Sequence, residues 1–211
     1  MTLFELAVTA FTTLIIAFGP LETAPVFGGL TVGLSRQDRF RLAFRAALIA
    51  GIVLFGFSLF GLALLGALHI SLDAFRVAGG ILLLLQSIDL IFAHPTGLSS
   101  ITPSEEVEAK GRPDIAVFPL AFPLIAGPAT MTAVLLLMGQ AGDSYLRKGV
   151  VLGAVTVCLL ITYLAMIFTD VLHKILKTTG SNVVARLSGV ILAALAVQFV
   201  FDGLKGAELF S

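Results

Sequence analysis

The sequence predicts an all-α membrane protein with six transmembrane helices, arranged as two inverted three-helix repeats in which the first and fourth helices are broken. Three observations lead to this prediction. Of the 211 residues, 58% are hydrophobic and only 12% are charged, whereas a soluble domain carries about 25% charged residues. The hydrophobic residues gather in long runs, and two of these runs are each interrupted by a Gly-Pro pair.

Six stretches are long and apolar enough to be membrane spans, each of which needs about 20 residues. They are Leu3–Leu30, Ala46–Leu68, Phe75–Phe92, Ile115–Met138, Val150–Thr169 and Val183–Phe201. The stretch 93–114 is rich in proline, glycine, serine and charge, which favours a loop. We therefore expect one membrane domain made of a first repeat (1–92), an inter-repeat loop (93–114) and a second repeat (115–211).

The first and fourth spans are interrupted at Gly19-Pro20 and Gly127-Pro128. Proline has no N–H, and its ring clashes with the preceding turn, so a helix that meets it kinks or stops. The backbone groups that such a break frees are tolerated at membrane depth only where protein or a watery cavity covers them. Two broken helices at corresponding positions of two halves indicate the binding site of a transporter.

A second motif also recurs between the halves. Arg76-x-x-Gly79-x-Ile81-Leu82 is repeated as Arg186-x-x-Gly189-x-Ile191-Leu192, at nearly the same offset as the two Gly-Pro pairs. Because three spans per half is an odd number, the second copy is predicted to be inverted in the membrane, as in many secondary carriers.

Basic residues near the ends of the spans predict the orientation, since they favour the cytoplasmic side. Six spans place both termini on one side, with four of the 13 basic residues: Arg76, Arg147, Lys148 and Lys205. The opposite side has the other nine, which are Arg36, Arg39, Arg41, Arg45, Lys110, Arg112, Lys174, Lys177 and Arg186. Both termini are therefore predicted to lie outside the cytoplasm.

The residues around the two breaks are the candidate substrate-binding residues: Gly19, Pro20, Glu22, Thr23, Gly127, Pro128, Thr130 and Thr132. The helix that restarts after each break has unpaired N–H groups with partial positive charge, which favour an anionic group such as a carboxylate. The threonines add hydroxyl groups. Prolines that only kink packed helices remain the alternative interpretation.

Glu22 is the candidate for ion or proton coupling and for contact with a solute amine, because an acid at membrane depth costs at least about 2.5 kcal/mol. A proline at the first helical position with an acid two residues later is also typical of a helix start. Glu22 is therefore either a capping carboxylate or a functional group, and the sequence leaves both open.

Other polar residues of the spans favour a structural interpretation. Interhelical hydrogen bonds are favoured for Gln86, Ser87, Asp89, Gln198 and Asp202. Asp89 and Asp202 lie near span ends, so the alternative is that they reach the membrane interface. A helix-packing face is expected of Gly189, Ala193 and Ala196. The three histidines share no ligand spacing, so we expect no metal. We also expect no cofactor, no enzymatic activity and no nucleic-acid partner, because nucleophile motifs and basic runs with interleaved aromatics are absent from the sequence.

Three stretches resemble the MarC family of bacterial inner-membrane proteins: Pro20-Leu-Glu-Thr-Ala-Pro25, Ile70–Leu82, and Phe118–Pro128 followed by Thr132. The likeness covers nearly the whole chain. It implies a six-span inner-membrane protein related to the LysE-type exporters, a family in which some members are classed as carriers of small neutral amino acids. The chain departs from the family at Gly19 (usually Asn or Asp), at Glu22 (usually Gly) and at Ala129 (often Gly). We therefore hypothesise that Glu22 has taken over the role of the missing Asn or Asp, or that selectivity differs.

Together these features predict a carrier of small neutral amino acids, such as alanine or glycine, in the bacterial inner membrane. Its expected partners are a small-molecule substrate, with a zwitterionic amino acid favoured, and the lipid bilayer. Proton or sodium coupling and a homo-oligomeric state are left open. The alternatives are an exporter of other small metabolites or drugs, a channel, and a membrane protein that transports nothing.

Overall fold

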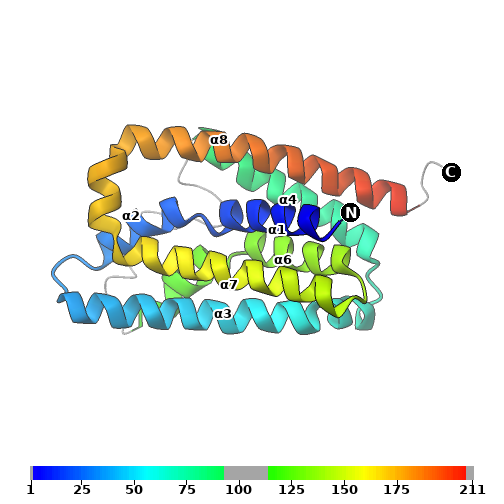
Figure 1. Cartoon of the computed structure of the whole chain (residues 1–211), viewed down its shortest axis with the longest axis horizontal. Helices are drawn as coiled ribbons and strands as arrows, with labels where there is room; N and C mark the ends of the chain where they lie inside the picture. The colour runs from blue at the N-terminus through cyan, green and yellow to red at the C-terminus, as the bar shows by residue number, and fades with distance from the viewer. Residues whose placement is uncertain (1, 93–113, 208–211) are drawn as a thin grey trace.

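The computed structural model describes residues 2–92 and 114–207, apart from the side chains of 177–179. The long helices lie side by side along one common axis, and both ends of the chain lie at the same end of the bundle (Figure 1). This agrees with an even number of spans. All of the predicted inter-repeat loop except Asp114 falls outside the described residues.

The described part of the chain is helical, and its helices account for five to six membrane spans. Five spans are Leu3–Leu30, Arg36–Ala67, Leu72–Phe92, Tyr145–Ile167 and Gly180–Gly206, and Ala116–Ile125 with Pro128–Ala141 makes a sixth if this bent pair counts as one. In chain order the elements are α1 (Leu3–Phe18), α2 (Pro20–Leu30), α3 (Arg36–Ala67), α4 (Leu72–Phe92), the wide helix η1 (Ala116–Ile125), α6 (Pro128–Ala141), α7 (Tyr145–Ile167) and α8 (Thr169–Gly206).

Helix ends follow local capping chemistry. Thr2 and Glu5 form a reciprocal capping box at the start of α1. Ser35 caps α3, so this helix begins at Arg36, ten residues before the predicted span at Ala46. The difference arises because an apolar window detects only the hydrocarbon part of a helix, whereas α3 continues through its basic residues. For the same reason α8 begins at Thr169 and turns before its spanning part (Figure 1).

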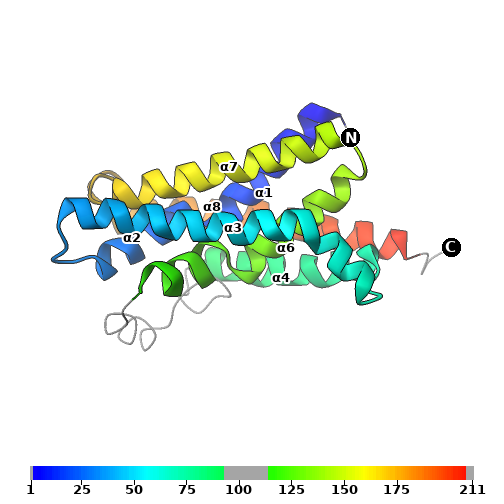
Figure 2. The same ribbon diagram turned by 90° about the horizontal axis from the view of Figure 1, so that it is seen from below.

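The core of the bundle is built around α6. Every residue from Ala129 to Met138 is buried except Met131. α6 contacts α1, α3, α4 and α7, and Figure 2 shows it between α3 and α4. The second break, at the start of this helix, is therefore enclosed by protein, as a break at membrane depth requires.

The last helices of the two halves, α4 and α8, form the tightest pair. A Cβ atom added to Gly80 would lie 2.7 Å from the carbonyl oxygen of Ala196, and one added to Gly189 would lie 2.9 Å from that of Ser87. Glycines that let two backbones approach are typical of membrane helix pairs. Gly189 and Ala196 therefore do lie on a helix-packing face, as predicted.

Each broken helix packs against the second helix of the other half. α1 and α2 contact α7, while η1 and α6 contact α3. Such an exchange is what an inverted repeat would produce, and the inverted repeat itself stays a prediction.

Large apolar side chains cover the outward faces of the bundle. Ile52 and Phe60 on α3, and Leu187 and Val190 on α8, are all exposed. Faces of this kind fit a lipid environment, because a soluble monomer seldom exposes large apolar patches. The chain is thus an integral multi-pass membrane protein.

Candidate functional site

The two breaks meet inside the bundle. The hydroxyl of Thr130, in the first turn after the second break, donates a hydrogen bond to the carbonyl oxygen of Ala17, just before the first break, at 3.0 Å. Both residues are buried. In an unbroken helix the Ala17 carbonyl would accept from the N–H of residue 21, so Thr130 replaces a bond that the break disrupts.

Thr23 acts on the same helix end from the other side of the first break. Its hydroxyl donates to the carbonyl oxygen of Phe18 at 3.4 Å, and its side chain is buried. Two carbonyls at the end of α1 are therefore satisfied by two threonines, one from each restarting helix. Both hydroxyls keep lone pairs that can accept a hydrogen bond from a solute.

Both restarting helices begin as the sequence indicates, with proline at the first helical position after a glycine. Gly19 precedes Pro20 in the left-handed conformation (φ 53°), and its N–H donates to the carbonyl of Ile16. Gly127 precedes Pro128 in an extended conformation. Because glycine has no side chain, neither residue can cap the first-turn N–H groups. In α2 the N–H of Glu22 donates to the Gly19 carbonyl instead, at 3.0 Å. The first-turn N–H groups that make no such bond remain suited to an anionic ligand.

Glu22 lies in the first turn of α2, half-buried, with its carboxylate folded back over Gly19. Its Oε2 atom is 3.1 Å from where a Cβ atom of residue 19 would stand. A capping-box carboxylate would accept from the N–H of Gly19, but that N–H is taken by Ile16. The reciprocal capping bond is therefore not made, whereas the first-turn position typical of a helix start is observed.

Thr132 is placed differently from the other candidate residues. Its methyl group points to α4, where a Cβ atom on Gly79 would lie 2.5 Å from it. The structure thus brings Gly19, Thr23, Thr130 and the end of α1 together, and it places Thr132 at the adjoining contact between α6 and α4.

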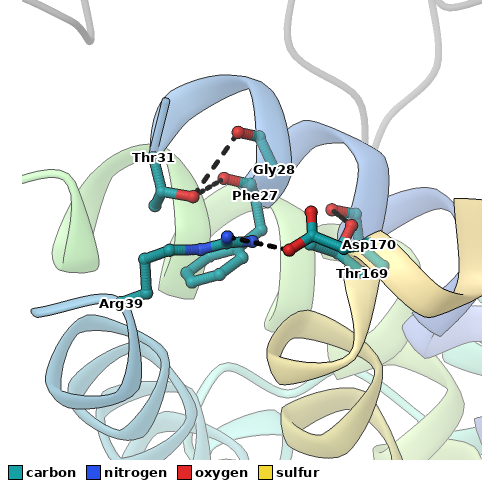
Figure 3. Close-up of polar contacts among 7 residues, drawn as sticks. Phe27, Gly28, Thr31, Arg39, Thr169 and Asp170 are labelled. Atoms are coloured by element: carbon teal, nitrogen blue, oxygen red, sulfur yellow. Dashed lines mark hydrogen bonds and ion pairs between the residues drawn. The ribbon is translucent and has the colours of Figure 1, made fainter. Parts of the chain in front are cut away.

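The far end of α2 is anchored by α3 and α8 (Figure 3). Thr169 donates a hydrogen bond to the carbonyl oxygen of Ala24 at 2.7 Å and packs against Gly28. Arg39 pairs with Asp170 at 3.1 Å and lies over the ring of Phe27. Sequence reasoning missed this cluster, because its members are far apart in the chain and lack a motif.

The prediction of interhelical hydrogen bonds is wrong for Ser87 and Gln198. Ser87 donates to the carbonyl of Leu84, and Gln198 donates to Asp202, each within its own helix. Gln86 is buried on α4 with a side-chain oxygen that lacks a partner among the described residues. Gln86 follows Gly79 by seven residues, so the two lie on the same face of α4.

Within residues 2–92 and 114–207, three or more His, Cys, Asp or Glu side chains do not gather as a metal site would require. The expectation of no metal and no cofactor stays a prediction.

Comparisons with known proteins match the whole bundle. The sequence pattern of "MarC family integral membrane protein" matches residues 4–208. A UPF0056 membrane protein of Methanocaldococcus jannaschii is 36% identical over 96% of this chain and 97% of its own length. The UPF0056 membrane protein YvbG of Bacillus subtilis is 34% identical over 97% of this chain and 96% of its own length. No solved structure gives a significant match.

Proposed function

We propose that this chain, which belongs to the MarC family of integral membrane proteins, is a secondary transporter of small neutral amino acids such as alanine or glycine. One observation carries the proposal: the Thr130 hydroxyl bonds to the Ala17 carbonyl at 3.0 Å, so two interrupted helices meet in the interior. Interrupted helices that meet between two halves form the solute sites of many carriers.

A zwitterion complements the groups at this point. Its carboxylate would lie toward the uncapped N-termini of α2 and α6, where the helix dipole favours negative charge. Its ammonium would lie toward the Glu22 carboxylate, which is folded back over the first break. The solute must be small, because α6 is buried along almost its whole length.

In this proposal transport follows from the inverted repeat. The two halves would rock around the meeting point of the breaks and expose it to each side in turn. Glu22 is the coupling candidate, because its carboxylate can exchange a proton or bind a cation as the solute moves. The cell inner (plasma) membrane, with both termini outside the cytoplasm, is the proposed location.

The direct test is exchange in proteoliposomes. Purified protein is reconstituted with internal unlabelled alanine, glycine or serine, and entry of the labelled amino acid is followed under imposed proton or sodium gradients. We expect counterflow of at least one of the three, accelerated by one of the gradients. The proposal is wrong if none of the three exchanges faster than in protein-free liposomes.

A further inference from the structure

The described residues include three side-chain oxygens that are buried without a hydrogen-bond partner, on Thr13, Gln86 and Gln140. An unpaired buried acceptor costs about 1–3 kcal/mol, so each one needs a physical reason. Gln86 is 4% exposed and lies in the C-terminal half of α4. Gln140 is at the opposite end of α6 from the second break.

The contacts between α4 and α6 give the level of Gln86 along the bundle. Gly139 stands against Leu72, and Gly79 stands against Thr132, so the two helices run antiparallel. Seven residues forward on α4 correspond to seven residues back on α6. Gln86, seven residues beyond Gly79, lies on the same face of α4. The same step back from Thr132 passes the break at Gly127 and reaches Ile125 at the end of η1, so Gln86 lies at about the level of the second break.

We propose that Gln86 is a specificity-determining residue of the solute site, with its Oε1 atom accepting a hydrogen bond from the ammonium group of the bound amino acid. This rests on the proposed transport of amino acids. A carbonyl oxygen accepts but cannot donate, so it favours a solute that carries N–H donors at this position. With Gln86 the site would thus bind an amino acid in preference to the carboxylic acid of the same shape.

The test compares Gln86→Met with Gln140→Met, which removes the same amide from the other end of the neighbouring helix. Alanine and propionate are titrated against each purified protein, and binding is read from the thermal stability in detergent. We expect Gln86→Met to weaken alanine binding at least tenfold and to leave propionate binding unchanged. Gln140→Met should bind both compounds as the wild type does.

Stability without solute separates a binding role from a structural one. Because Gln86→Met removes an unpaired acceptor, we expect the unliganded variant to be at least as stable as the wild type. Gln86→Asn, which keeps the amide but shortens it by one methylene, should fold and also bind alanine more weakly. It provides the test if the methionine variant does not fold.

Two results would overturn the inference. If both Gln86 variants bind alanine as tightly as the wild type, Gln86 does not contact the solute, while transport of amino acids stands. If the wild-type protein responds to none of alanine, glycine and serine and exchanges none of them, the proposed function and this inference fail together.

Discussion

The two breaks differ at the third residue of the helix that restarts after each of them. After Pro20 this residue is Glu22, and after Pro128 it is Thr130. Thr130 crosses to the other break and satisfies the Ala17 carbonyl, whereas Glu22 folds back over its own break. The second break thus supplies a hydrogen bond between the two breaks, whereas the first supplies a carboxylate. The residue two positions after the proline therefore differs in chemistry between the two breaks.

The charge at the first break should have the largest effect on transport. Removing one charge of a buried polar contact costs about 2 kcal/mol or more, which corresponds to about 30-fold. We expect Glu22→Gln to lower alanine exchange in proteoliposomes by about this factor and to alter its dependence on pH. The matched control is Glu5→Gln, which changes the acid at the same position of α1. Unaltered exchange and pH dependence in Glu22→Gln would mean that Glu22 is structural.

The hydroxyl at the second break should have the next largest effect, on stability. Thr130→Val keeps the shape but leaves the buried Ala17 carbonyl unpaired, at a cost of about 1–3 kcal/mol. The control is Thr162→Val, because the buried Thr162 hydroxyl donates only to the Cys158 carbonyl of its own helix. Denaturation in detergent micelles measures both. An equal loss in the two variants would contradict a special role of the bridge between the breaks.

The sequence predicted the spans and the positions of both breaks well, because long apolar runs and Gly-Pro pairs are local signals. It also predicted that α2 and α6 begin at Pro20 and Pro128. It could not predict that Thr130 reaches Ala17 or that Thr169 reaches Ala24, because these bonds join residues more than 100 positions apart. The unpaired oxygen of Gln86 was also not predictable, since it depends on what surrounds the side chain.

The anchor at the far end of α2 tests whether the first break is held from outside the site. Thr169→Val removes the donor to the Ala24 carbonyl, and we expect a loss of about 1 kcal/mol of stability. Thr31→Val should cost less, because Thr31 donates to carbonyls of α2 itself. Thermal denaturation of both variants gives the comparison, and an equal cost would show that the contact with α8 does not stabilise α2.

The smallest effect is expected from the exposed ion pair beside that anchor. The Asp170 side chain is 71% exposed, and exposed pairs contribute less than about 1 kcal/mol. Asp170→Asn should therefore change thermal stability only slightly, and less still at high salt. A large loss that persists at high salt would mean that the pair holds α2, α3 and α8 together.

The central claim is that the two breaks meet inside the membrane and enclose the solute. Cross-linking tests it most directly, after Cys158, the sole cysteine, is replaced by serine. Cysteines at Ala17 and Thr130 should be joined rapidly by a short bifunctional thiol reagent in native membranes, and excess alanine should slow the reaction. Cysteines at Ala17 and Gln140 should not react, because Gln140 lies about 15 Å further along α6. No cross-link between the first pair, or equal rates for the two pairs, would contradict the claim.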